Sequence, residues 1–160
     1  MHITVISDSH GNFKAVEKAI MRDPSADWII HLGDGEKDLN SFILRHLEFE
    51  QKIIRVAGNC DTTSLAPDKF ILPLLGHKIF ATHGHRYAVR NDLDIIKRNA
   101  EKEGCDIILY GHTHIRYNNY EDGFYIMNPG SCSCPHDKFP PSFGRIDILP
   151  SGILTNIVDI

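Results

Sequence analysis

The stretch Ile3-Thr4-Val5-Ile6-Ser7-Asp8-Ser9-His10 places a short apolar run directly before two side chains that can bind a metal ion. The same order recurs four times. The later runs are Trp28 to Leu32 before Gly33-Asp34, Ile53 to Ala57 before Gly58-Asn59, Ile79 to Thr82 before His83-Gly84-His85, and Ile107 to Tyr110 before Gly111-His112-Thr113-His114. Short apolar runs bounded by such residues are typical of β-strands. The metal-binding residue types therefore stand where strands end.

Strands that alternate with helical segments predict β-α-β units and a largely parallel sheet. In such a sheet the loops at the carboxyl ends of the strands open on one edge. Residues that lie far apart in the sequence are therefore expected to meet there.

Length, composition and charge predict one globular domain, residues 1–160, with 42% hydrophobic residues. The net charge of -4, with the histidines counted as neutral, offers no basic face for long nucleic acid or an anionic membrane. Neither a signal-peptide pattern nor an apolar stretch of the ~20 residues needed to span a membrane is present. We therefore expect a cytoplasmic protein whose four cysteines are reduced.

Apolar residues at three- and four-residue steps predict three helices. The first follows Asn12 as its N-cap and ends before Asp23-Pro24. The second follows the Asp34 loop, with inward residues Leu39, Phe42, Ile43 and Leu47. The third runs from about Asn91 to Glu103, and Gly104 stops it.

Short strands separated by Gly- and Pro-rich turns dominate the remainder. They are predicted at Tyr125 to Met127, Gly144 to Ile148 and Ile153 to Val158, together with Phe70 to Leu75 earlier in the chain. These strands suggest a second, mostly antiparallel sheet. The predicted fold class is therefore α/β, with two packed, mixed β-sheets flanked by α-helices.

The ligand-type residues favour a site for two metal ions. In an extended segment residues two apart point the same way, so Asp8 with His10, and His112 with His114, would each reach one site. With Asp34, Asn59 and His83 the set has seven members, which is too many for one tetrahedral zinc. Two divalent ions would exceed the charge of the two carboxylates and attract phosphate, and a bridging hydroxide would hydrolyse a phosphoester.

The order Asp-x-His, Gly-Asp, Gly-Asn, His-x-His and Gly-His-Thr-His resembles the calcineurin-like metallophosphoesterase family, from Ile3 to about Ser131. Length, Gly58-Asn59-Cys60-Asp61 and Asn128-Pro129-Gly130-Ser131 resemble its small single-domain bacterial and archaeal phosphodiesterase branch. The family's fold is the two-sheet arrangement that the strand pattern already suggested.

The resemblance implies a ligand set and a reaction. Asp8, His10 and His114 would bind the first ion, Asn59, His83 and His112 the second, and Asp34 both. The expected activity is metal-dependent hydrolysis of a phosphodiester by a hydroxide that bridges the ions. These residue types accept manganese, iron, nickel, cobalt and zinc, and manganese is the first expectation.

Cys60 departs from much of the family, which has a histidine after the Gly-Asn pair. A thiol replaces an imidazolium acid poorly, so leaving groups that are stable as anions are favoured. His85 is expected to contact the phosphate or to orient its neighbours, because it follows a ligand by two residues on the same strand face. Asn59, Cys60, Asp61 and His85 are the candidate catalytic residues.

Other interpretations stay open. The alternatives are a phosphomonoesterase acting on a nucleotide or phosphoprotein, which Cys60 disfavours, and a scaffold like the retromer subunit of the same family, which the complete ligand set disfavours.

The expected partner is a small phosphodiester, and the branch resembled predicts a homo-oligomer. Specificity is expected from the loops 62–68, 86–92 and 132–141. The remaining histidines are expected to be structural, and Cys132 and Cys134 to be exposed thiols near the site.

Overall fold

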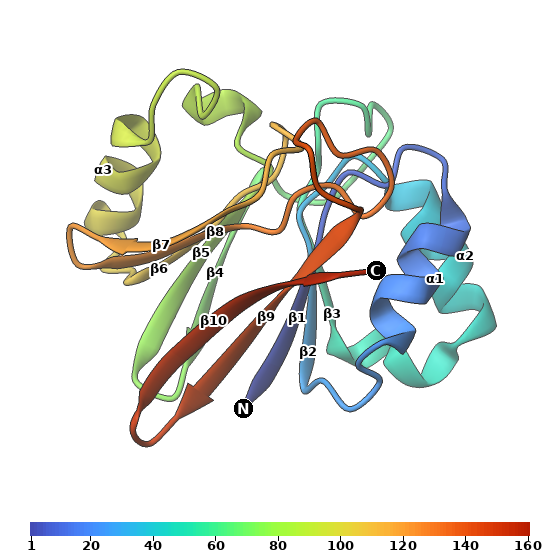
Figure 1. The fold of residues 1–160 in the computed structure, drawn as a ribbon, viewed down its shortest axis with the longest axis horizontal. Coiled ribbons are helices and arrows are strands. Elements are labelled where there is room, and N and C mark those ends of the chain that lie inside the picture. Colours follow the sequence, from blue (N-terminus) through green and yellow to red (C-terminus); the bar gives the residue numbers. More distant parts are fainter.

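The computed structural model describes residues 1–160, and its chain forms two packed five-stranded sheets with helices outside them (Figure 1). The first sheet has the strand order β10-β9-β1-β2-β3 and the second has the order β4-β5-β6-β8-β7. Helices α1 and α2 cover the outer face of the first sheet, and α3 covers the second (Figure 1). The predicted α/β fold class is confirmed.

The strands of the first sheet are β1 (His2–Ile6), β2 (Trp28–His31), β3 (Ile53–Arg55), β9 (Ser142–Leu149) and β10 (Gly152–Asp159). Those of the second sheet are β4 (Lys69–Leu74), β5 (His77–Thr82), β6 (Ile107–Leu109), β7 (Tyr117–Glu121) and β8 (Phe124–Asn128). In the first sheet β1, β2 and β3 are parallel, and in the second β5, β6 and β8 are parallel. Each sheet adds antiparallel strands at its edges, so both are mixed.

The strand assignment differs from the sequence prediction in two ways. β9 and β10 extend the first sheet, since β9 pairs with β1, whereas β5 and β6 belong to the second. β7 was not predicted because its sequence, Tyr-Asn-Asn-Tyr-Glu, has no apolar alternation and lies at an edge of the sheet. Periodicity reports which face of a strand is buried, but it does not report the partner strand.

The helices are α1 (Phe13–Met21), α2 (Glu36–Arg45) and α3 (Asp94–Lys102), with two 3-10 helices, η1 (Leu47–Lys52) and η2 (His85–Tyr87). The Asn12 side chain accepts a hydrogen bond from Ala15 N (3.2 Å), so the predicted cap of α1 is present. α3 is shorter than predicted and begins at Asp94. Leu47 lies in η1 and is 65% exposed, so its prediction as an inward helix residue was wrong.

The core has three parts, one between the sheets and one under each helical layer. The central cluster contains Ile3, Val5, Ile79, Ile107 and Met127, all fully or almost fully buried. β9 approaches Met127 of β8 closely because Gly144 has no side chain there. This packing aligns the carboxyl ends of β1, β2, β3, β5 and β6 at one end of the molecule (Figure 1).

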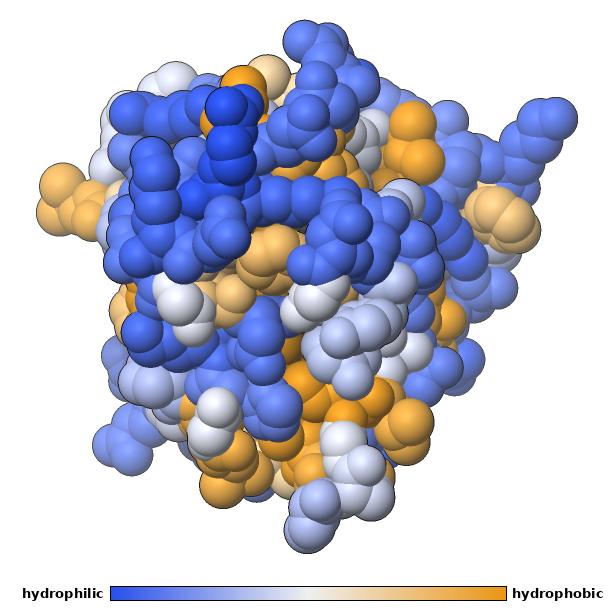
Figure 2. All heavy atoms as spheres, turned by 90° about the vertical axis from the view of Figure 1, so that its left-hand side faces the viewer, coloured by the Kyte–Doolittle hydropathy of each residue, from blue (hydrophilic) through white to orange (hydrophobic).

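The outer surface differs between the two ends of the molecule. On the face in Figure 2 the upper part is mostly hydrophilic, and apolar atoms gather in the lower part, at the end that carries the β4–β5 connection. That connection includes Leu75, which is 65% exposed. No helix in the structure is long and apolar enough to cross a membrane.

Candidate metal centre

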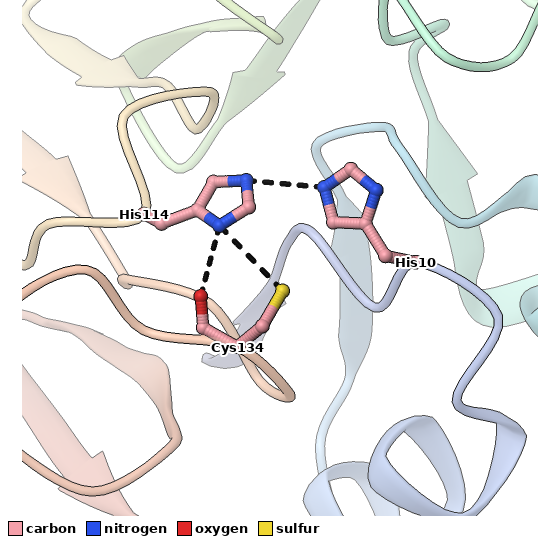
Figure 3. Close-up of side chains that lie close together, drawn as sticks. All are labelled: His10, His114 and Cys134. Carbon is pink, nitrogen blue, oxygen red and sulfur yellow. Dashed lines mark hydrogen bonds between the residues drawn. The ribbon is translucent and has the colours of Figure 1, made fainter.

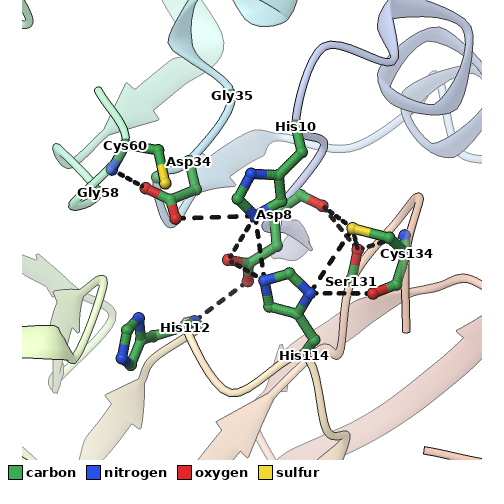
Figure 4. Close-up of polar contacts among 12 residues, drawn as sticks. Asp8, His10, Asp34, Gly35, Gly58, Cys60, His112, His114, Ser131 and Cys134 are labelled. Atoms are coloured by element: carbon green, nitrogen blue, oxygen red, sulfur yellow. Dashed lines mark hydrogen bonds and ion pairs between the residues drawn. The ribbon is translucent and has the colours of Figure 1, made fainter. Parts of the chain in front are cut away.

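The seven predicted ligands all lie in loops at the carboxyl ends of the parallel strands. The first sheet supplies Asp8 and His10 after β1, Asp34 after β2 and Asn59 after β3. The second sheet supplies His83 after β5, and His112 and His114 after β6. Figure 4 shows how residues from the two sheets face one another. The centre is therefore assembled across the contact between the sheets.

The ligand loops have unusual backbone conformations. Five of the eight non-glycine residues with positive φ are predicted ligands, namely Asp8, His10, Asp34, His112 and His114. The expectation that Asp8 and His10, or His112 and His114, sit in extended segments was therefore wrong. Left-handed backbone is costly for such residues, and concentrated strain of this kind is typical of functional sites. Tight left-handed turns bring each pair to the sheet edge directly after the strand.

Asp8, His10 and His114 form one group of the centre. His114 Nε2 lies 3.1 Å from His10 Nε2 and 3.2 Å from Asp8 Oδ1, and Asp8 is fully buried. The hydrogen bond and charge of Asp8 raise the pKa of His114 to about 9, although burial opposes this. Without a metal ion, a proton on His114 balances the buried carboxylate.

The orientation of His114 is fixed by the loop 132–141. Its Nδ1 donates a hydrogen bond to the Cys134 carbonyl (2.9 Å), and the Cys134 thiol lies 3.6 Å from the same nitrogen. Figure 3 shows Nδ1 facing Cys134 and Nε2 facing His10. A backbone acceptor at one ring nitrogen leaves the other available to a metal ion.

Asp34, His83 and Asn59 form the second group. His83 Nε2 lies 3.4 Å from Asp34 Oδ2 and 3.1 Å from Asn59 Oδ1, while its Nδ1 donates to the Leu32 carbonyl (2.7 Å). Burial raises the pKa of Asp34, but the hydrogen bond and charge of His83 outweigh it and hold that pKa below its usual range. The pKa of His83 is raised in turn, because Asp34 and Asp8 outweigh the effect of its burial.

Two further contacts complete the arrangement. Asp34 Oδ2 also lies 3.7 Å from His10 Nε2, so this carboxylate stands between the two groups. The His112 ring centroid is 5.1 Å from that of His83, and its backbone N–H donates to Asp8 Oδ2 (3.1 Å). Burial, and then the positive charges of His83 and Arg90, lower the pKa of His112 to about 4, so its imidazole is neutral at pH 7.

The donor set fits divalent metal ions. Asp8 Oδ1 is buried, and its polar neighbours are the imidazoles of His114 (3.2 Å) and His10 (3.9 Å), so it depends on a proton or a metal ion to balance its charge. Asp8, Asp34 and His83 each offer a ligand atom within 4.8 Å of the others. Mixed carboxylate, amide and imidazole donors are those that first-row transition metals accept.

Asp61 and Cys60, two candidate catalytic residues, have different positions. The Asp61 carboxylate accepts hydrogen bonds from four backbone N–H groups, those of Asp34 (2.7 Å), Gly35 (3.1 Å), Glu36 (3.0 Å) and Gly58 (3.0 Å). It thereby caps α2, whose own N-cap is Gly35, and joins the β2 and β3 loops. Cys60 is exposed beside Asp34, and its backbone N–H donates to Asp34 Oδ1 (2.7 Å).

His85 does not lie on a strand, contrary to the sequence prediction. β5 ends at Thr82, Gly84 adopts φ 101°, and His85 begins η2. Its ring centroid is nevertheless 5.3 Å from that of His83, and its Nδ1 is buried without a hydrogen-bond partner. Burial, and then the charge of His83, lower its pKa.

His2, His46 and His77 have carboxylate partners away from the ligand positions, whereas His136 stacks on the His114 ring (centroids 4.2 Å apart). His2 contacts Asp23 and Asp147, His46 contacts Glu17, and His77 contacts Asp106. His31 is buried within the first sheet, where its Nδ1 accepts from Gly33 N. Cys132 is 1% exposed and its burial raises its pKa, so the expectation of an exposed thiol was wrong at that position. The contact of Cys134 with His114 could not be read from the sequence, because the loop 132–141 has no periodic pattern.

A sequence model of the calcineurin-like phosphoesterase superfamily domain matches residues 1–150. The chain belongs to this superfamily. It is 33% identical to the probable metallophosphoesterase YsnB of Bacillus subtilis, over 92% of this chain and 85% of that protein. It is 30% identical to the phosphodiesterase YfcE of Escherichia coli, over 92% and 88%. The chain is therefore a phosphoric ester hydrolase of a family that uses divalent metal ions.

The fold is shared with solved structures. A predicted phosphoesterase of Streptococcus pneumoniae has a TM-score of 0.80 at 27% identity, covering 98% of this chain and 97% of that one. The Vps29 of Entamoeba histolytica has a TM-score of 0.75 at 22% identity, and a likeness at that identity concerns the fold alone. The predicted family and fold are thus confirmed.

Proposed function

We propose that the chain is a phosphodiesterase whose seven ligands hold two divalent ions, with Asp34 shared between them. The observation that carries the proposal is the position of Asp34 Oδ2, 3.4 Å from His83 Nε2 and 3.7 Å from His10 Nε2, between the two groups of ligands. Asp8, His10 and His114 would hold one ion, and Asn59, His83 and His112 the other. Such ions, when bound, would stabilise charge on phosphoryl oxygens and would activate water as a nucleophile near neutral pH.

The chain's own residues would prepare the centre for an anionic substrate. The carbonyls of Leu32 and Cys134 hold His83 and His114 with Nε2 directed inward. Asp61 fixes the backbone on both sides of Asp34. Only the two carboxylates carry negative charge among the seven ligands, so two divalent ions leave a positive surplus that attracts phosphate.

A diester with a good leaving group suits this centre better than a monoester. Burial, and then the Asp34 carboxylate, raise the pKa of the Cys60 thiol to about 11, so it is a poorer acid than an ordinary cysteine. The leaving oxygen must therefore depart as a stable anion. The lowered pKa of His85 keeps its imidazole neutral, so it would contact the phosphate through a hydrogen bond and not as a charge.

The experiment compares bis(p-nitrophenyl) phosphate with p-nitrophenyl phosphate, using protein stripped of metal and then supplied with manganese or another divalent ion. We expect metal-dependent cleavage of the diester, and weak cleavage of the monoester. A higher kcat/KM for the monoester would instead establish a phosphomonoesterase. No turnover with manganese, nickel, iron, cobalt or zinc would favour the scaffold function.

A further inference from the structure

Two cavities adjoin the metal centre: a polar one beside Asp34, and a more apolar one next to the ligands of the second sheet. The more apolar cavity has a volume of ≈ 370 Å³, and its walls include Val89, Arg90, Tyr110, Ile115, Tyr117 and His136. It reaches the metal centre at two points. Thr113, between the ligands His112 and His114, is part of its wall, and the His136 ring stacks on His114 with centroids 4.2 Å apart and an interplanar angle of 23°.

The walls of this cavity suit a flat apolar group. Two tyrosines, a valine and an isoleucine are its hydrophobic lining residues. Tyr110 is almost fully buried and so forms a fixed wall, whereas Ile115 is 50% exposed at the rim. Aromatic walls favour ring-shaped ligands, since stacked or edge-to-face rings add to the hydrophobic contribution.

The two arginines at the cavity differ in what they contact. Arg116 lies 2.9 Å from Asp159 and 3.7 Å from Asp137, and its guanidinium stands over the Phe139 ring, so it is engaged within the protein. Arg90 is exposed and makes no ion pair. It lines the same cavity as Thr113, which lies between the ligands His112 and His114. Arg90 thus offers an unpaired cation at the mouth of an aromatic cavity, close to a metal ligand.

The polar cavity beside the first sheet has the opposite character. Its volume is ≈ 290 Å³, and Asp34, Cys60, Thr62, Thr63 and Lys37 are among its lining residues. A phosphodiester has two ester groups, and the metal centre has two unlike cavities, one beside the ligands of each sheet. A monoester would leave one of them unfilled.

We propose that the cavity lined by Tyr110 and Tyr117 binds a ring-bearing ester group of the substrate, and that Arg90 binds an anionic oxygen of the same molecule. The proposal rests on the phosphodiesterase function and narrows it to asymmetric diesters with one aromatic group. Arg90 and Ile115 then determine specificity, and the metal ligands determine turnover.

The test is inhibition of manganese-dependent bis(p-nitrophenyl) phosphate hydrolysis by thymidine 5'-monophosphate and by methyl phosphate. In the unaltered protein the nucleotide should inhibit at least about tenfold better than methyl phosphate, because only it fills the cavity. Arg90→Gln and Ile115→Ala should each reduce that preference several-fold and raise KM for the aryl diester more than they lower kcat. Arg90→Lys should restore part of the loss.

Arg98→Gln and Leu44→Ala are matched controls, since both residues are exposed on helices and line neither of the two cavities. A nucleotide preference that persists in Arg90→Gln and Ile115→Ala would overturn the proposal while leaving the phosphodiesterase function intact. Absence of any metal-dependent turnover would instead refute the function. In that case the cavity is still tested by saturation-transfer NMR between tyrosine protons and the nucleotide on the metal-free protein. A transfer signal that is unchanged in Arg90→Gln and Ile115→Ala would reject binding in the cavity.

Discussion

The carboxyl edges of the two sheets contribute different chemistry to one centre. The edge of the first sheet provides both carboxylates and the amide, with one histidine, whereas the edge of the second provides only histidines. Each buried carboxylate of the first sheet faces an imidazole of the second, Asp8 with His114 (3.2 Å) and Asp34 with His83 (3.4 Å). Protonated imidazoles therefore hold the two edges together when metal is absent, and in the proposed centre metal ions would replace those protons.

The largest effect is expected when the shared carboxylate is removed. Asp34→Asn should lower kcat/KM for bis(p-nitrophenyl) phosphate on the order of 10³-fold, because one neutral oxygen cannot serve both groups of ligands. Steady-state kinetics at saturating manganese checks this, with the exposed Glu101→Gln as the carboxylate control. Activity within tenfold of the unaltered protein would contradict a bridging role.

A smaller effect is expected when the loops at the edge of the first sheet lose the support of Asp61, which is not a predicted metal ligand. Asp61→Asn should lower metal affinity about 10- to 100-fold and destabilise the fold by about 2 kcal/mol, because charged hydrogen bonds to four backbone N–H groups are weakened. Isothermal titration with manganese and thermal unfolding measure the two quantities. Unchanged metal affinity would show that the hydrogen bonds accepted by Asp61 stabilise the fold and do not affect metal binding.

The exchange of protons for metal predicts a pH dependence. Since the pKa of His114 is about 9 in the metal-free protein, manganese must displace a proton below that pH. Affinity should therefore rise by at least about tenfold per pH unit up to about pH 9, and more steeply at lower pH, where His83, whose pKa is also raised, carries a second proton. His114→Gln, which carries no titrating proton, should reduce this slope by about tenfold per pH unit and leave the contribution of His83. An unaltered slope in that variant would assign the proton elsewhere.

The shifted pKa values of His114 and Asp34 predict how the stability of the metal-free protein depends on pH. His114 has a folded pKa above its ordinary value of 6.5, so its pairing with Asp8 stabilises the fold fully below about pH 6.5, and this contribution disappears as the pH rises through about 9. Asp34 has a lowered pKa, so its contribution is present above its ordinary value of 3.8 and is lost in acid. Urea unfolding with a chelator present should show a maximum in the free energy of unfolding between about pH 3.8 and pH 6.5, where both contributions are present. A stability that still increases above pH 9 would contradict the ion pair.

The smallest effect is expected at Cys60. Cys60→Ala should change kcat for the aryl diester less than about fivefold, whereas a general acid would be worth 10²- to 10⁴-fold. Cys60→His should instead favour poorer leaving groups. A series of alkyl aryl phosphodiesters with different ring substituents would reveal this as a weaker dependence of kcat on the pKa of the leaving group. A large loss in Cys60→Ala would assign the thiol a direct role.

The sequence predicts the fold class and places all seven ligands at the edge, because apolar runs followed by Asp, Asn and His mark strand ends regardless of which strands pair. It could not assign β9 and β10 to the first sheet, since the pairing of Val5 with Gly144 joins residues at opposite ends of the chain. It also missed the left-handed conformation of His10 and His114, because turn geometry is not encoded in hydrophobic periodicity. The contact between His114 and the Cys134 carbonyl depends on an irregular loop, and only the folded chain reveals it.

The most direct test of a shared centre is the number of manganese ions per chain, measured by elemental analysis after stripping, reloading and gel filtration. The structure predicts two ions per chain in the unaltered protein and at most one in Asp34→Asn, since His83 and His10 would then lose their common carboxylate. One ion per chain in the unaltered protein, or two in Asp34→Asn, would contradict it.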